Sequence, residues 1–274
     1  MFAFRRARAF AWIAGLSFIS VDPAAAAGDL LVAPTRIVLD GTRGTEVVLN
    51  NIGTEPATYR VSLELRRMRA DGSLEDVDPA SANDHDVTTL GMISYAPRRV
   101  VLPPNQPQSI RIGVRAPQGL ADGEYRAHML FRAIPDAKPV ESGTARKEGV
   151  SIALTPIYGV TIPIIVRQGA LTATAAISDP KIVRDADGPA LAFTLSRSGT
   201  RSVYGLIRVT KPGNAKPVFE ARGIAVYAEL SSRTVKFSVP EEVAAALAGP
   251  ARIEYVEDSE AGGATMASLD AVIR

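Results

Sequence analysis

The sequence predicts an all-β protein made of two immunoglobulin-like β-sandwich domains. Short segments with apolar residues at alternate positions recur along the chain, which is the period of a strand with one buried face. Clusters of Gly, Pro, Asn and Asp separate these segments, and helical periodicity is scarce. About seven segments on either side of residue 167 match the number of strands in an immunoglobulin-like sandwich.

Residues 1–27 have the three-part plan of a secretory signal peptide. Three arginines precede an apolar run from Ala9 to Val21, and Ala25-Ala26-Ala27 stand before Gly28. A transmembrane anchor is the alternative, but the run is shorter than the roughly 20 residues that span a bilayer. We therefore expect cleavage after residue 27, and a mature chain in the periplasm that does not insert into the membrane.

The charge and the cysteine count exclude several function classes. Without residues 1–27 the chain keeps 28 of its 31 Lys and Arg and 28 of its 29 Asp and Glu, so its net charge is zero. A nucleic-acid partner is not expected, because the basic excess belongs to the targeting segment. The chain has no cysteine, which excludes disulfides, thiol catalysis and cysteine-ligated metals.

The first sandwich is expected over residues 28–167. Its predicted strands alternate with turns of sequence DGTRG, NIGTEP, RADGS, PPNQP and LADGE. The strand segments are LLVAPTRIVL, TEVVLNN, ATYRVSLELRRM, ISYAPRRVVL, QSIRIGVRA and EYRAHMLFRAI, followed by a longer seventh segment.

The second sandwich is expected over residues 168–274, with the joint near Arg167-Gln168-Gly169. The segment PEEVAAALAG, flanked by Pro240 and Gly249, is the one helix that the sequence predicts. The predicted strands are LTATAAISDPKIV, PALAFTLSRSG, VYGLIRVTKP, KPVFEARGIAVY, RTVKFSVP, PARIEYVED and TMASLDAVI.

The seventh segment of the first sandwich, VSIALTPIYGVTIPIIV (150–166), is unusual. It is longer than the usual five or six residues of a strand, and its prolines favour an edge position. It follows a polar stretch, 136–149, that we read as a long loop. An apolar edge strand can pair with a partner, a mode known as β-augmentation. Two core strands with a kink at Pro156 are the alternative. The residues expected to face a partner are Val150, Ile152, Leu154, Tyr158, Val160 and Ile162.

Catalytic and metal-binding chemistry is not indicated. His85 and His128 are the only histidines, and neither has the spacing of a metal site. His85 lies in ANDHD, which we read as a solvated loop without the ligand spacing of a calcium site. His128 lies in an alternating strand and is expected to be a packed or surface residue. We therefore expect no enzyme, no cofactor and no metal.

Four segments, in this order, resemble the periplasmic pilus-assembly chaperones of the PapD-like family. VAPTRIVLDGTRGTEVVLNN has an arginine in its first strand and a V-x-L-x-N pattern in the next. ISYAPRRVVLPPNQPQSIRI, GEYRAHMLFRAIP and RIEYVEDSEAGGA follow. The resemblance implies two sandwiches in a boomerang, which bind an incomplete pilin or fimbrial subunit and complete its fold with a strand. It also implies an outer-membrane usher as a further partner.

The resemblance assigns roles to single residues. Arg36 matches the cleft arginine that binds the subunit's terminal carboxylate, for which a planar guanidinium is suited; an ordinary surface arginine is the alternative. The family also has a cleft lysine, but Gly159 or Pro163 stands at that place, so the chain resembles a divergent branch. Arg36 could act alone, or Lys147 or Arg98 could supply a second cation.

Glu124, Arg167 and Asp258 match a charge network that joins the two domains in the family. Three unrelated surface charges are the alternative. The function that the sequence supports is a periplasmic chaperone for pilin, fimbrial or spore-coat-like subunits. A secreted structural or adhesive sandwich protein is the main alternative, and a secreted hydrolase is a weaker one.

Overall fold

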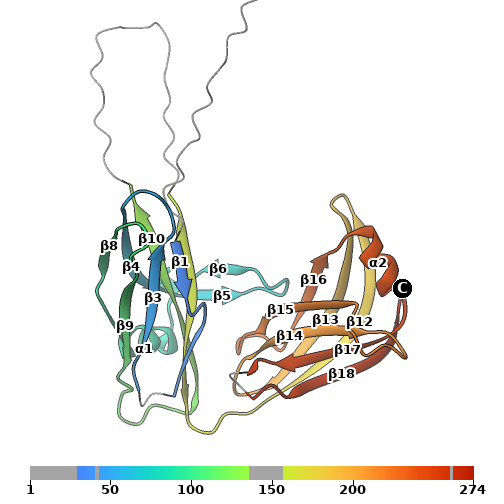
Figure 1. Ribbon diagram of the computed structural model, residues 1–274. Coiled ribbons are helices and arrows are strands. Elements are labelled where there is room, and N and C mark those ends of the chain that lie inside the picture. The colour runs from blue at the N-terminus through green and yellow to red at the C-terminus, as the bar shows by residue number, and fades with distance from the viewer. Residues whose placement is uncertain (1–29, 41–42, 136–156, 260–261) are drawn as a thin grey trace, which may run out of the picture.

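The computed structural model describes residues 30–40, 43–135, 157–259 and 262–274, whose strands form two β-sandwiches (Figure 1). The predicted all-β fold is therefore confirmed. Each expected strand segment contains one strand or two consecutive strands. Among the described residues, no helix is long and apolar enough to cross a membrane.

The first sandwich packs a four-stranded sheet against a five-stranded sheet. The four-stranded sheet has the order β1-β3-β9-β7 and the five-stranded sheet the order β2-β11-β10-β4-β8. The segment LLVAPTRIVL changes sheets midway, because β1 pairs with β3 and β2 pairs with β11. The strands are β1 (Leu30–Ala33), β2 (Ile37–Leu39), β3 (Thr45–Asn51), β4 (Ala57–Glu64), β7 (Ile93–Ala96), β8 (Arg99–Leu102), β9 (Gln108–Val114), β10 (Gly123–Ile134) and β11 (Gly159–Gln168).

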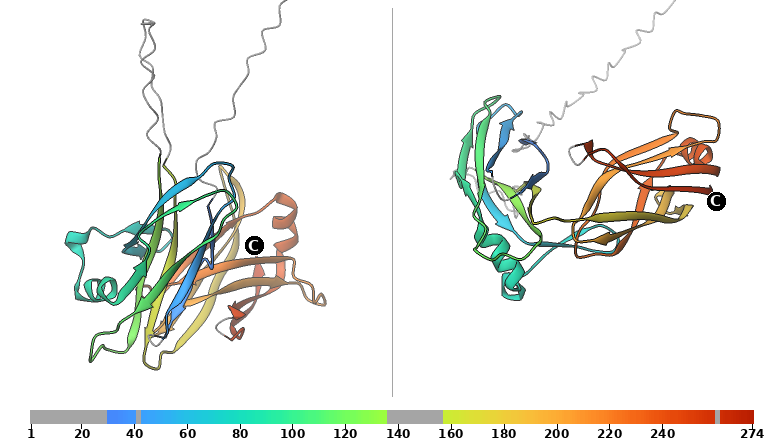
Figure 2. Two further views of the ribbon diagram at one scale, coloured as in Figure 1. Left: turned by 60° about the vertical axis from the view of Figure 1, so that its left-hand side comes forward. Right: turned by 90° about the horizontal axis from the view of Figure 1, so that it is seen from below.

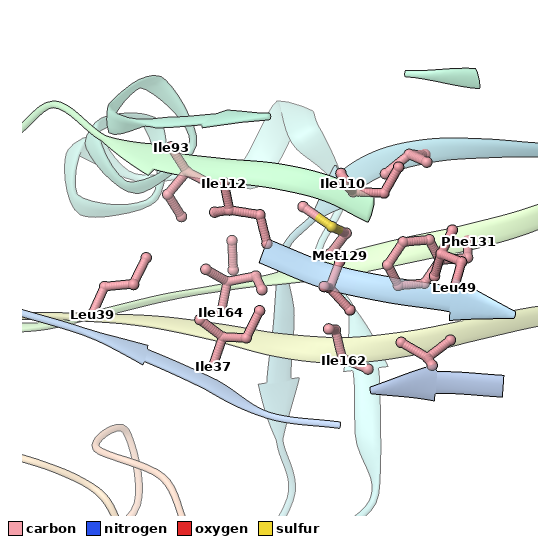
Figure 3. Close-up of a cluster of buried hydrophobic side chains, with 14 of the residues drawn as sticks. Ile37, Leu39, Leu49, Ile93, Ile110, Ile112, Met129, Phe131, Ile162 and Ile164 are labelled. Atoms are coloured by element: carbon pink, nitrogen blue, oxygen red, sulfur yellow. The ribbon is translucent and has the colours of Figure 1, made fainter. Parts of the chain in front are cut away.

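Alternate residues of both sheets fill the core of the first sandwich (Figure 3). In β10, Tyr125, Ala127, Met129 and Phe131 point inward and are at most 5% exposed. Full burial of a side chain the size of Met129 or Phe131 stabilises a fold by about 1.5–3 kcal/mol. The intervening β10 residues therefore lie on the opposite, outer face of the sheet.

The second sandwich packs a three-stranded sheet, β12-β13-β16, against a four-stranded sheet, β15-β14-β17-β18. The predicted helix is confirmed as α2 (Glu241–Leu247), with Pro240 at its N-cap. The strands are β12 (Ala173–Asp185), β13 (Gly188–Gly199), β14 (Val203–Thr210), β15 (Phe219–Val226), β16 (Ser232–Ser238), β17 (Gly249–Glu257) and β18 (Thr265–Ile273).

A second helix, α1 (Asp84–Met92), corrects the expectation of a solvated loop at His85. Asn83 and Asp86 form a capping box, in which each side chain accepts a hydrogen bond from the other's backbone N–H. Asp86 is buried and pairs with Arg67 at 2.5 Å. A 3₁₀ turn, η1 (Pro79–Ser81), leads into this helix, which lies at the margin of the first sandwich in both views of Figure 2.

A small hairpin of the first sandwich reaches the second sandwich (Figure 1). Its strands are β5 (Arg66–Met68) and β6 (Leu74–Asp76), and Gly72 takes a positive φ of 87° in the turn. Ala70 accepts a hydrogen bond from the Thr234 amide, and the Met68 amide donates to Glu229. Beside it, a small apolar cluster combines Met68 and Ile165 with Ala225 and Tyr227 of the second sandwich.

Candidate functional site

One edge of β11 is open over half of its length. β10 pairs with β11 from Gly159 to Gln168, whereas β2 pairs with the other edge only at Ile164–Val166. Over Gly159–Pro163 that second edge has no strand partner among the described residues. Such an edge presents main-chain N–H and C=O groups to which a further strand can bind.

The chain just before β11 continues this edge and is apolar. The Ala133 amide donates to the carbonyl oxygen of Tyr158 at 2.9 Å, so pairing with the β10 segment extends beyond the strand. Ile157 and Tyr158 are about half exposed, at 49% and 50%. Two large apolar side chains thus lie in solvent at the start of the open edge.

The six residues expected to face a partner have different positions. Val150, Ile152 and Leu154 lie outside the described residues, and Tyr158 is exposed. Val160 packs against the first sandwich's own core, and Ile162 is 2% exposed within it (Figure 3). The expectation that Ile162 faces a partner is corrected, because its side chain fills this core. From Val160 onward the alternation is that of a core strand.

Arg36 lies where β2 stops covering β11. The parallel register pairs Ile37 with Ile164, which places Arg36 beside Pro163 at the end of the open edge. Its guanidinium carbon lies 4.5 Å from the centre of the Tyr204 ring, in the second sandwich. This side chain is therefore at the junction of the two sandwiches rather than on a plain surface.

The surroundings of Arg36 suit an anion. Its Nε is buried and has no hydrogen-bond partner among the described residues. Burial lowers the pKa of Arg36 from its ordinary value, and the neighbouring cation Arg167 lowers it further. A buried donor beside a second positive charge would be stabilised by a carboxylate, which accepts charge-assisted hydrogen bonds.

Glu124 and Arg167 meet at the domain junction. Arg167 Nε lies 3.0 Å from Glu124 Oε2, and the glutamate side chain is only 1% exposed. The same carboxylate oxygen accepts a hydrogen bond from the backbone amide of Ser202, in the second sandwich, at 3.1 Å. An ion pair of the first sandwich is thus tied to the main chain of the second.

Asp258 follows β17 and lies close to this junction. The Asp258 amide donates to the carbonyl oxygen of Tyr204 at 3.0 Å, and the Asp258 carbonyl oxygen accepts a hydrogen bond from the Gly263 amide at 3.1 Å. Tyr204 is the residue that stacks with Arg36. The membership of the Asp258 carboxylate in the charge network stays a prediction.

Sequence reasoning missed a second group of contacts at the junction. Arg126 lies 3.7 Å from the centre of the Tyr227 ring and pairs with Glu229 at 2.5 Å. His128, on the same face of β10, is 1% exposed and meets Tyr227 edge-on. The signal was available, because Glu124, Arg126 and His128 are polar at alternate positions of a strand whose other face is apolar.

Both histidines pack against aromatic rings. The ring of His85 stacks on Tyr125, with centroids 4.4 Å apart. Burial, together with Arg126 and Arg66, lowers the pKa of His128 to about 3. Within the described residues, no group of three His, Asp or Glu side chains is placed to hold a metal ion.

Of the two other cations considered at the sequence level, Arg98 lies 5.4 Å from the centre of the Tyr95 ring. Lys147 lies outside the described residues. Gly159 and Pro163 are paired with Arg132 and His128 of β10. A second cation at the open edge therefore stays a prediction.

No protein-family model matches the chain, and no curated relative matches it. Among solved structures, it is similar to one from the CsuC–CsuE chaperone–tip adhesion subunit complex of Acinetobacter baumannii, with 13% identity and a TM-score of 0.46. That match covers 90% of this chain and 100% of the solved one.

The Pseudomonas aeruginosa chaperone CupB2 is similar at 16% identity and a TM-score of 0.45, with coverage of 89% of this chain and 100% of the solved one. A structure of the Salmonella enterica SafA pilin with the SafB chaperone is similar at 14% identity and a TM-score of 0.42, with coverage of 89% and 95%. The chain thus matches solved pilus chaperones over about 90% of its length, and TM-scores of this size assign it neither a partner nor an activity.

Proposed function

We propose that this chain is a non-enzymatic periplasmic chaperone that binds pilin-like subunits along the open edge of β11. The observation that carries the proposal is the edge at Gly159–Pro163, which has no strand partner within the described ranges. It ends at Arg36, whose Nε has no hydrogen-bond partner there either. A subunit strand would pair with this edge, and residues 150–158 would lengthen the contact. The subunit would then pass to an outer-membrane usher.

The position of Arg36 supports one direction for the bound strand. β2 runs parallel to β11 and begins just after Arg36. A partner strand that is also parallel to β11, in line with β2, would end with its carboxyl terminus at Arg36. An antiparallel strand would place its amino terminus there and would bring two positive charges together. Parallel pairing with a free terminal carboxylate is therefore the favoured arrangement.

A synthetic peptide can test this arrangement directly. We expect a peptide of alternating Val and Thr with a free carboxyl end to bind the chain, and its C-terminal amide to bind about 10- to 100-fold more weakly, because one charge-assisted interaction is lost. In Arg36→Gln the two peptides should bind equally. Arg115→Gln, which changes an exposed arginine of the same sandwich, should keep the difference. Equal binding of both peptides by the native chain would show that the terminal carboxylate does not contribute to binding.

A second experiment separates the donor segment from the core. We expect Ile152→Ser with Leu154→Ser to weaken binding and to leave the unfolding free energy of the free chain almost unchanged. Ile162→Ser should lower that free energy by several kcal/mol, because a polar group would replace a core side chain. Large destabilisation by the double variant would show a core strand instead. Capture of no subunit in the periplasm, with self-assembly into fibres, would favour a structural or adhesive protein.

A further inference from the structure

Three arginines stand side by side across the outer face of the five-stranded sheet. Arg99 of β8 is paired with Arg60 of β4, and Arg60 is paired with Arg132 of β10. Directly paired residues share one face of a sheet, with Cα atoms about 4.5–5.5 Å apart. All three are exposed, and we call them the arginine row.

The arginine row faces the same side as the domain junction. Arg132 lies on the face of β10 that also carries Glu124, Arg126 and His128 and that contacts the second sandwich. It is four residues beyond His128, which is about 14 Å along an antiparallel strand. The row therefore lies on the face of the first sandwich that contacts the second sandwich, about 14 Å farther along β10 than the buried His128.

The row has no counter-charge among the residues that the structure describes. Within the described residues, none of its three guanidinium groups takes part in an ion pair or a hydrogen bond. Like charges placed directly opposite each other destabilise a sheet. A local arrangement that lowers stability, with no compensating charge among the described residues, is typical of a binding surface.

The arginine row lies next to the open edge of β11, in the same line of paired residues. The strand order is β8, β4, β10, β11, and the register continues from Arg132 to Gly159 of β11. Gly159 has no side chain beyond Cα, and only Leu130 Cδ1 comes close to the position that a Cβ would take. A residue bound opposite Gly159 would thus be about 10 Å from Arg132, two strand spacings away. The side chains of a glutamate and an arginine together cover that distance.

We infer that the arginine row recognises an acidic residue of the bound partner strand, at the position opposite Gly159. The inference rests on the proposed function, because it places that strand on the β11 edge. With the terminal residue beside Ile162, next to Arg36, the acidic residue is the third before it. Arginine suits this role, since its planar guanidinium binds a carboxylate through two parallel hydrogen bonds.

Three forms of the Val/Thr peptide test the inference. One carries Glu at the third position before its free C-terminal residue, one carries Gln there, and one carries Glu one residue later. The native chain should bind the first about tenfold more tightly than the second, as expected for a few exposed charge pairs. It should not favour the third, because a shift by one residue moves the carboxylate to the opposite face.

Two charge-matched variants complete the test. In Arg60→Gln with Arg99→Gln and Arg132→Gln, the preference for Glu over Gln should disappear, and the thermal midpoint should stay the same or rise. Arg43→Gln with Arg115→Gln and Arg274→Gln neutralises three exposed arginines elsewhere and should keep the preference. A preference that survives in the first variant overturns the inference.

The outcomes separate this inference from the proposed function. One outcome is that the Glu and Gln forms bind with equal affinity while amidation of the peptide's C-terminus still weakens binding. That result would support the β11 edge and overturn the role of the arginine row. Row-dependent binding of hexaglutamate, without binding of any Val/Thr peptide, would overturn the inference, because the row would then bind acidic chains without the β11 edge. Row-dependent binding to phosphatidylglycerol vesicles, with no preference among peptides, would assign the row to a membrane surface and overturn the inference.

Discussion

The side chains that join the two sandwiches are charged and largely enclosed, so the loss of one partner has a large effect. Glu124 receives both the Arg167 guanidinium and the Ser202 amide on one carboxylate oxygen. Without Arg167 this carboxylate would keep a single neutral donor in a place that solvent hardly reaches. Breaking a buried pair in this way usually costs more than the pair itself contributes.

We expect Arg167→Ala to lower the free energy of unfolding by about 3–5 kcal/mol, as for a buried ion pair. The control is Arg252→Ala, because Arg252 pairs with Asp270 in solvent, with side-chain exposures of 54% and 70%. Loss of such an exposed pair should cost less than about 1 kcal/mol. Urea denaturation of both variants measures the two losses of unfolding free energy. Similar small losses in the two would mean that the junction pair does not hold the domains.

His128 should make stability depend on pH. Its pKa is about 3 in the folded chain, because burial and the cations Arg126 and Arg66 disfavour the charged ring, against about 6.5 when unfolded. The unfolded chain therefore binds a proton that the folded chain does not, and stability is lost as the pH falls below 6.5. Between pH 7.5 and pH 5 this residue should lower the unfolding free energy by roughly 2 kcal/mol.

The comparison that isolates His128 is between the native chain and His128→Leu, with urea melts at both pH values. The variant should lose less stability on acidification, by about the same 2 kcal/mol. His85→Gln, at an exposed position of α1, serves as the control and should follow the native chain. Parallel losses in the native chain and His128→Leu would show that His128 takes up a proton in the folded state.

Among the elements, the hairpin of β5 and β6 connects the two sandwiches. It follows β4 directly and reaches Thr234 and Glu229 of the second sandwich through backbone hydrogen bonds. Its turn also packs tightly, since a Cβ on Gly72 would collide with the Arg233 guanidinium. Arg233 in turn donates to the carbonyl oxygen of Ala225. The sequence motif RADGS predicted the turn, but not what the turn touches.

Gly72→Ala should destabilise the chain more than an ordinary turn glycine does. Both Gly72 and Gly119 have a positive φ, of 87° and 74°, and near Gly119 there is open space for a Cβ. Gly119→Ala should therefore lower the free energy of unfolding by only about 1 kcal/mol, the strain of placing a residue with a Cβ at a positive φ. Gly72→Ala should cost at least about 1.5 kcal/mol more, the typical loss for a hydrogen bond to a charged group. Equal thermal midpoints for the two variants would show that Arg233 moves aside freely.

The sequence predicted local structure better than contacts between distant segments. Alternation in strands such as ALAFTLS shows which residues face a core, because that signal lies within one element. Ile162 shows the limit of this signal, since alternation cannot distinguish a face that fills the chain's own core from one offered to a partner. α1 was missed because its nine residues carry a weak apolar pattern, although Asn83 and Asp86 form a capping pair.

The charged junction was only partly predictable. Glu124 and Arg167 could be named from the family resemblance, and the structure brings them together. Tyr204, Tyr227 and Glu229 could not be named, because their role depends on how the second sandwich is placed against β10. The arginine row depends likewise on register, which pairs residues from three strands that are far apart in the sequence.

The whole molecule should unfold as one unit as long as the junction is intact. Tyr227 is central to it, because this residue is 6% exposed, stacks on Arg126 and contacts the apolar cluster of Met68 and Ile165. Tyr227 belongs to neither of the two main cores, although Ala225, Tyr204 and Leu230 of its own sandwich pack in the same small cluster. Removing this ring should therefore weaken the coupling between the domains and leave each core complete.

Calorimetry of Tyr227→Ala tests this coupling. We expect the native chain to give one unfolding transition, and the variant to give two, because loss of a buried aromatic side chain typically costs about 3–5 kcal/mol. Tyr158→Ala, at a half-exposed position of the open edge, should keep a single transition near the native midpoint. Two transitions already in the native chain would show that the junction does not couple the sandwiches. One transition at a lower midpoint in Tyr227→Ala would show that the coupling survives without this ring.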